Sequence, residues 1–123
     1  MQKISYKTES DVVKDEGKNR FSRDTDTLAQ SGKVICGAVL GKVTNTGKFK
    51  QLDTAANDGT QIAAAIILQN ADASAADIEV VTLKRRAQVV LQSLTWPAGI
   101  TAAQQKIAID QLAALGIIAR RGV

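Results

Sequence analysis

The side chains that most enzymes use for acid–base and nucleophilic chemistry are scarce in this sequence. It has no histidine and only one cysteine, Cys36. Histidine is the usual acid–base group near neutral pH, so serine–histidine and cysteine–histidine nucleophilic arrangements are excluded. One cysteine also cannot supply the ligands of a usual zinc site. Because Cys36 lies in the apolar run 34–36, we predict that it is a small buried hydrophobic residue.

Carboxylates could still bind a hard cation or act as an acid–base pair, but in most of the chain they are scattered. Beyond the N-terminal segment they are Asp53, Asp58, Asp72, Asp77, Glu79 and Asp110. The glycine-rich motifs GxGxxG and GxxxxGK[ST], which cradle phosphate groups, do not occur. The sequence therefore predicts no catalytic residue, no cofactor-binding residue and no metal site, and we do not expect an enzyme.

Lys84, Arg85 and Arg86 form the one cluster for which a nucleic-acid partner can be argued. Three adjacent cations could neutralise about two or three phosphates and give weak, salt-sensitive binding. Consecutive residues of a strand point to opposite faces, however, and only 3% of the residues are aromatic and able to stack on bases. We therefore favour a solvated corner, or a charged contact with an acidic protein surface, over a nucleic-acid partner.

The elements that must position these side chains are mostly short strands. Gly37 and Gly41 interrupt the apolar run 34–44, which is typical of a strand that bends or closely approaches other backbone. The sequence Asn45-Thr46-Gly47 predicts a hairpin with a left-handed glycine, and Asn57-Asp58-Gly59 predicts a second turn. Further strands are predicted from the apolar runs at 62–68, 78–83, 89–96 and 117–119, whereas 70–77 is predicted as a loop or a short helical turn.

One helix is predicted, and it begins at Thr101. Thr101 and Gln104 have the spacing of a capping box, in which each side chain pairs with a free backbone amide of the first turn. Gly116 suits the left-handed position after the last turn. The predicted buried face is Ala108, Ile109, Leu112 and Leu115, with Lys106, Asp110 and Gln111 lying away from it.

The fold class that follows is mainly β: a small β-barrel or β-clip-like domain with one α-helix in its C-terminal region. Parallel βαβ winding is not expected, because the helical spacers that it needs are missing. Residues 1–20 are polar, charged and without helical or strand periodicity, so we expect them to form a flexible N-terminal arm before a single domain at 21–123. No signal peptide or membrane span is visible, so we expect synthesis in the cytoplasm without a membrane partner.

Several segments in the same order resemble the head decoration protein D family of lambdoid bacteriophages. These segments are Phe21-Ser22-Arg23-Asp24, residues 37–43, Thr46-Gly47-Lys48, Asn57-Asp58-Gly59, residues 64–68, Leu94-Thr95-Trp96-Pro97, and the closing helix with Leu115-Gly116-Ile117-Ile118. The similarity covers about residues 21 to 120. Ala65 departs from it, because many members have glycine at this position.

The resemblance implies a homotrimer that stands at local threefold positions of an expanded icosahedral capsid and stabilises it. The implied partner is the major capsid protein, and the implied location is the exterior of the virion capsid, after synthesis in the bacterial host. It also implies that the N-terminal segment contacts the capsid, and we carry this over to Phe21, Ser22, Arg23 and Asp24. Two alternatives remain open: a small basic module that associates with nucleic acid, and another β-rich virion component such as a tail or spike domain.

Overall fold

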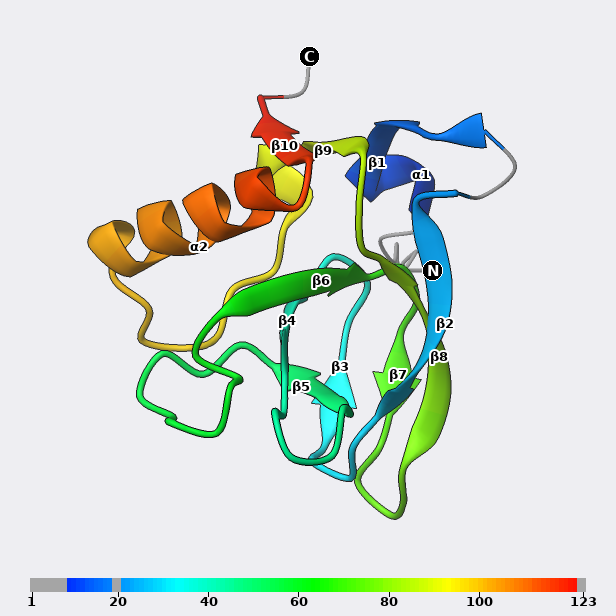
Figure 1. The fold of residues 1–123 in the computed structure, drawn as a ribbon, viewed down its shortest axis with the longest axis vertical. Helices are drawn as coiled ribbons and strands as arrows, with labels where there is room; N and C mark the ends of the chain where they lie inside the picture. Colours follow the sequence, from blue (N-terminus) through cyan, green and yellow to red (C-terminus); the bar gives the residue numbers. More distant parts are fainter. Residues whose placement is uncertain (1–8, 19–20, 122–123) are drawn as a thin grey trace, which may run out of the picture.

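Five strands close into a barrel at the centre of the structure, a computed structural model that describes residues 9–18 and 21–121. The strands are hydrogen-bonded in the order β2-β5-β4-β6-β8 (Figure 1). Their bounds are β2 Arg23–Leu28, β4 Val39–Lys42, β5 Phe49–Gln51, β6 Ala63–Ile67 and β8 Ile78–Leu83. The mainly β fold with a small barrel and one C-terminal helix, predicted from the sequence, is confirmed.

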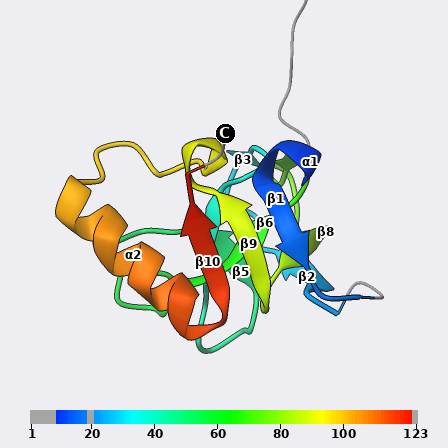
Figure 2. The ribbon, with the colours of Figure 1, turned by 90° about the horizontal axis from the view of Figure 1, so that it is seen from above.

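A three-stranded sheet lies against one end of the barrel and has the order β1-β9-β10 (Figures 1 and 2). Its strands are β1 Val13–Glu16, β9 Ala87–Val90 and β10 Ile117–Arg120, and helix α2 (Ala102–Ala114) lies beside β10. The remaining elements are the short helix α1 Glu9–Val12, the 3-10 turn η2 Leu91–Ser93, and the two-stranded sheet of β3 Lys33–Val34 and β7 Ala71–Asp72. Strand β7 lies in the segment that was predicted as a loop or helical turn.

The connection from β9 through α2 to β10 corrects one expectation. Strand β10 pairs with β9 in parallel, with Ile117 opposite Ala87, so this part of the chain is a βαβ unit. Parallel strands need a long crossover, and η2, the loop that contains Pro97, and α2 together supply it. The expectation was wrong because the one predicted helix, which begins at Thr101, is itself the spacer between the parallel strands β9 and β10.

The turns and close approaches predicted from glycine are confirmed. Gly47 has a φ of 72° in the hairpin that joins β4 to β5, a conformation that L side chains rarely adopt. A Cβ atom at Gly41 would lie 2.4 Å from the carbonyl oxygen of Thr60, so only glycine lets β4 approach that backbone. These two glycines set the path of the chain around one side of the barrel.

Buried side chains form two clusters, one on each side of the barrel wall. The cluster from the five barrel strands includes Leu28, Leu40, Phe49, Ile67 and Val80. The second cluster joins the barrel to the three-stranded sheet and α2, and it includes Val12, Ile66, Val89, Leu112 and Ile117. Cys36 is 1% exposed and belongs to the second cluster, as predicted for a small buried hydrophobic residue.

The boundary of the N-terminal segment differs from the prediction of an arm over 1–20. Residues 9–16 form α1 and β1, and β1 pairs with β9 in antiparallel orientation. The side chain of Val12 is fully buried in the second cluster. Val13 of β1 packs against the same cluster, and the rest of β1 is polar because the strand lies at the edge of its sheet. Residues 1–8 and 19–20 lie outside the described residues.

Helix α2 begins at the predicted capping box, in which Thr101 Oγ1 accepts a hydrogen bond from Gln104 N–H and Gln104 Oε1 accepts one from Thr101 N–H. Its buried face is narrower than predicted, because Leu115 is 40% exposed. Gln111, expected to lie away from the core, instead accepts a hydrogen bond from the Ala63 backbone N–H at the start of β6. None of the helices in the described part of the chain is long and apolar enough to cross a membrane.

Candidate functional site

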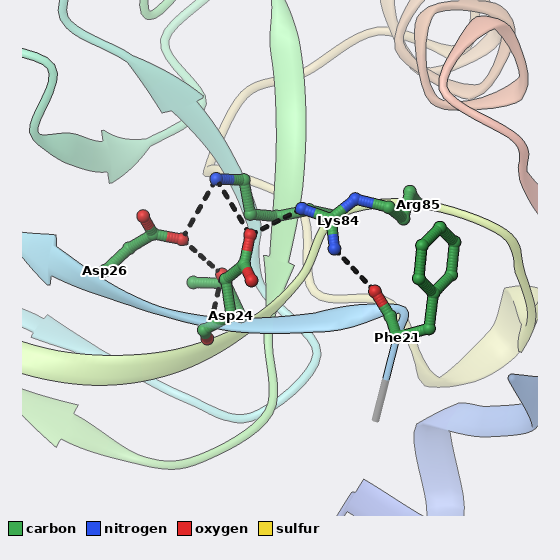
Figure 3. Close-up of polar contacts among 6 residues, drawn as sticks. Phe21, Asp24, Asp26, Lys84 and Arg85 are labelled. Carbon is green, nitrogen blue, oxygen red and sulfur yellow. Dashed lines mark hydrogen bonds and ion pairs between the residues drawn. The ribbon is translucent and has the colours of Figure 1, made fainter. Parts of the chain in front are cut away.

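The four predicted contact residues, Phe21 to Asp24, lie beside the basic cluster Lys84–Arg86. Strands β2 and β8 are antiparallel, with Arg23 opposite Leu83, so the start of β2 meets the residues that follow β8. The Lys84 backbone N–H donates a hydrogen bond to the Ser22 carbonyl oxygen at 2.8 Å. Figure 3 shows the side chains that gather at this junction, which we call the β2–β8 corner.

Asp24 is the acidic centre of the corner. One carboxylate oxygen, Oδ2, lies 2.5 Å from Arg85 Nη2 and 3.3 Å from Lys84 Nζ (Figure 3). The hydrogen bond from Arg85 is the largest cause that holds the pKa of the Asp24 carboxyl below its ordinary value of 3.8. Burial opposes this lowering, and the hydrogen bond from Lys84 and the charges of Arg85 and Lys84 add to it. Asp24 is therefore ionised at neutral pH and neutralises part of the basic cluster.

The Lys84 side chain lies next to side chains of the barrel strands β2 and β5. Its Nζ atom lies 3.5 Å from Asp26 Oδ2 and 5.6 Å from the centre of the Phe49 ring. The same Asp26 oxygen accepts a hydrogen bond from the Thr82 hydroxyl at 2.6 Å. Lys84 is thus held by two carboxylates and an aromatic face, and little of its charge remains for an outside partner.

Arg85 holds Phe21 in place at the surface. Its Nη1 atom donates to the Phe21 carbonyl oxygen at 2.5 Å, and its guanidinium carbon lies 5.5 Å from the centre of the Phe21 ring (Figure 3). Phe21 is nevertheless 55% exposed. A large aromatic side chain that is positioned by a cation and still exposed is suited to packing against another molecule.

Ser22 and Arg23 face the protein rather than the solvent. Ser22 is fully buried, and its hydroxyl accepts from Gly17 N–H at 2.7 Å and donates to the Arg86 carbonyl oxygen at 2.6 Å. Arg23 forms a two-point ion pair with Glu16, with Nε–Oε2 and Nη2–Oε1 distances of 2.8 and 2.7 Å. Ser22 therefore holds the connection between β1 and β2 against Arg86, and Arg23 holds the start of β2 against the end of β1. Of the four predicted contact residues, Phe21 and Asp24 keep exposed surface.

The three adjacent cations do not form one basic patch. Lys84 and Arg85 are paired with Asp24 and Asp26 on β2, whereas Arg86 is exposed and has no ion-pair partner among the residues that the structure describes. The acidic surface expected opposite the cluster therefore belongs to the same chain. Asp26 and Glu16 were not singled out from the sequence, because the stretch Arg23–Leu28 has one apolar residue and no alternation of apolar and polar residues.

The described residues contain no group of three or more cysteine or acidic side chains that could hold a metal ion. Away from the corner, hydrogen bonds from Lys48 and from the Gln30 backbone lower the pKa of Asp77, and two other acids with lowered pKa values are held by hydrogen bonds within their own turns. The side-chain hydrogen bond from Thr60 lowers the pKa of Asp58, and that from Ser74 lowers the pKa of Asp72. Both carboxylates cap turns and are exposed, so they support the loops rather than a reaction.

The sequence matches the model of a known protein family. The family model of the bacteriophage lambda head decoration protein D matches residues 3–117, nearly the whole chain. The matched region includes the β2–β8 corner, the five barrel strands and helix α2, and it ends at the first residue of β10. Comparison with curated proteins gives no match.

Proposed function

Since the chain belongs to the family of the bacteriophage lambda head decoration protein D, we propose that it binds the expanded phage capsid as a homotrimer at local threefold positions and stabilises the shell. The observation that carries this proposal is the family match over residues 3–117. The partner would be the major capsid protein, and the location would be the exterior of the virion capsid. Binding and mechanical support need no catalytic group, which agrees with a sequence that has no histidine.

Exposed apolar side chains support association with other subunits. Six large hydrophobic residues of the described chain are at least 40% exposed: Phe21, Ile35, Ile62, Ile107, Leu115 and Ile118. Side chains of this kind are buried when protein surfaces associate, and a small domain with only 3% aromatic residues gains stability from such burial. A threefold arrangement would present three equivalent copies of the contact surface and strengthen binding through avidity.

The β2–β8 corner is the proposed centre of the capsid contact. Phe21 offers an exposed aromatic ring and Asp24 a part-exposed carboxylate, while Ser22 and Arg23 hold the backbone that carries them. The N-terminal segment remains part of the proposal. A deletion of residues 1–8 tests it without removing Val12 or β1, and unchanged shell affinity would reject a role for those eight residues.

The proposed function is tested by mixing the purified chain with capsid shells from the phage or prophage that encodes it. We expect saturable binding to expanded, undecorated shells and none to unexpanded shells, together with a trimer mass by native mass spectrometry of the free or shell-released protein. Absence of binding to expanded shells would overturn the proposal. A tail or spike domain could also be trimeric, but it would not bind these shells.

A titration with DNA addresses the nucleic-acid alternative. We expect only weak binding that disappears at moderate salt, because Lys84 and Arg85 are already paired with Asp24 and Asp26. Tight binding that is abolished when Lys84, Arg85 and Arg86 are all changed to alanine would favour the nucleic-acid module instead.

A further inference from the structure

A groove of about 770 Å³ lies beside Phe21 and is lined by the β1–β2 connection and the three-stranded sheet. Phe21 and Lys18 line it from the connection, Arg86 from the residue before β9, and Ile118 from β10. It therefore adjoins the β2–β8 corner, with which it shares Phe21. The inference that follows rests on the proposed function, because it concerns what this groove receives from the capsid.

The floor of the groove is the outward face of the three-stranded sheet. Asp15 pairs with Gln88, and Gln88 pairs with Ile118, so these three side chains form one row across β1, β9 and β10. The neighbouring row, which contains Ala87 and Ile117, faces the core. Ile118 is 43% exposed in this outward row, although a polar residue would be the usual choice there. The floor thus offers apolar surface close to the exposed ring of Phe21.

Arg86 supplies the charge of the groove. It is exposed and unpaired among the described residues, and its φ of 40° makes it the only described residue other than glycine in the left-handed region. That conformation is unfavourable for arginine, and it is held by the hydrogen bond from the buried Ser22 hydroxyl to the Arg86 carbonyl oxygen. Strained backbone that surrounding contacts maintain is found where the position of a side chain matters for function.

The free charge in the groove is positive. Glu16 lines it but is already paired with Arg23, which leaves Lys18 and Arg86 against the single carboxylate of Asp15. We propose that the groove receives a segment of the major capsid protein in which a carboxylate lies next to an apolar side chain. The carboxylate pairs with Arg86, and the apolar side chain packs between Phe21 and Ile118.

The first test changes the charge without straining the backbone. Arg86→Asn removes the guanidinium, and asparagine tolerates the left-handed conformation, so the unfolding temperature should not fall. We expect its affinity for expanded, undecorated shells to be about tenfold weaker than that of the wild type, as for loss of an interfacial ion pair. Arg86→Lys should retain most of the affinity. Lys106→Gln, which removes an exposed cation from α2, controls for net charge and should bind as the wild type does.

The second test changes the apolar surface with a matched control. Ile118→Thr should weaken shell binding by about fivefold, whereas Ile118→Val, which has the size of threonine but stays apolar, should retain most of the affinity. Raising the salt concentration should weaken the wild type more than Arg86→Asn, because that variant has lost the screened charge pair.

The outcomes separate this inference from the proposed function. If wild-type protein binds shells and Arg86→Asn and Ile118→Thr bind equally well, the groove is not the contact and only the inference is overturned. If the two variants instead change the oligomeric state in solution, the occupant is a second copy of the chain, which also overturns it. If the wild type does not bind shells at all, the proposed function itself fails.

Discussion

At the scale of single residues, most of the polar side chains at the β2–β8 corner are paired within the chain. Asp24 joins Arg85 and Lys84, Asp26 joins Lys84, and these ion pairs hold the exposed ring of Phe21 at a fixed place through Arg85. Lys84 and Arg85, which the sequence offered as possible contacts for nucleic acid, are therefore paired with carboxylates inside the corner. The corner presents outward an aromatic ring and, beside it, the Arg86 cation, which forms no ion pair with the residues that the structure describes.

The lowered pKa of Asp24 predicts a pH dependence of stability. Because the folded pKa lies below the ordinary value of 3.8, the unfolded chain binds the proton more tightly. The ionised carboxylate therefore stabilises the fold at pH values above 3.8, and this contribution is lost as the pH falls through the folded pKa. The side chain is 39% exposed, so solvent screening limits the effect to less than about 1 kcal/mol.

Asp24→Asn tests this dependence. We expect the variant to be slightly less stable than the wild type at pH 6 and the difference to shrink as the pH falls below 3.8 and through the folded pKa, in urea unfolding at each pH. A difference that stays constant over this range would show that the carboxylate charge does not contribute, and that the substitution acts through packing.

Ser22→Ala should destabilise the protein more than its small change in volume suggests. The buried hydroxyl satisfies both the Gly17 N–H and the Arg86 carbonyl, so its removal leaves backbone groups unpaired at a cost of about 1–3 kcal/mol. Urea unfolding at neutral pH measures this loss. Ser31→Ala is the control, because Ser31 is exposed, and it should cost less than about 0.5 kcal/mol. Equal effects of the two substitutions would contradict the role given to Ser22.

At the scale of elements, the sequence predicted the parts that local chemistry decides. The capping box at Thr101, the hairpin at Gly47 and the strand over 78–83 depend on residues close together in the chain, and all three are confirmed. Strands β1 and β2 were missed, because their sequences VKDE and RDTDTL carry few apolar residues. They are strands because of partners far away in the sequence, and no local pattern shows those partners.

Of the candidate site, too, the sequence predicted only the parts that depend on neighbouring residues. Phe21 and the basic cluster could be singled out, but the pairing of Asp24 with Arg85 joins residues 61 positions apart. The inward orientation of Ser22 likewise depends on Arg86, at a separation of 64 positions. The left-handed conformation of Arg86 had no signal in the sequence, because glycine or asparagine is the usual residue at such a position.

Val12→Ala tests whether the N-terminal segment is part of the body. The valine side chain is fully buried against the second cluster, so its truncation should cost about 1.5–3 kcal/mol in the free energy of unfolding. Val90→Ala, at a half-buried position on the outward face of β9, should cost less. If Val12→Ala leaves the unfolding curve unchanged, residues 9–16 do not contribute to the stable fold in solution.

At the scale of the whole molecule, the fold consists of a barrel and a smaller layer, the three-stranded sheet with α1 and α2, which lies against one end of the barrel. Both the first described segment, α1 and β1, and the last strand, β10, belong to that layer (Figure 1). The proposed groove and the β2–β8 corner adjoin it, so the proposed capsid contacts are gathered at one end of the molecule. The opposite end carries the hairpin of β4 and β5 and the connection from β7 to β8, and we assign it no contact with the shell.

The central claim is that binding of this protein stabilises an expanded capsid. The most direct measurement is the rupture temperature of expanded, undecorated shells, followed by light scattering or electron microscopy, with and without a saturating amount of the protein. We predict a higher rupture temperature at saturation, because a ligand that binds only the intact shell stabilises it by mass action. Saturating binding that leaves the rupture temperature unchanged would contradict the account.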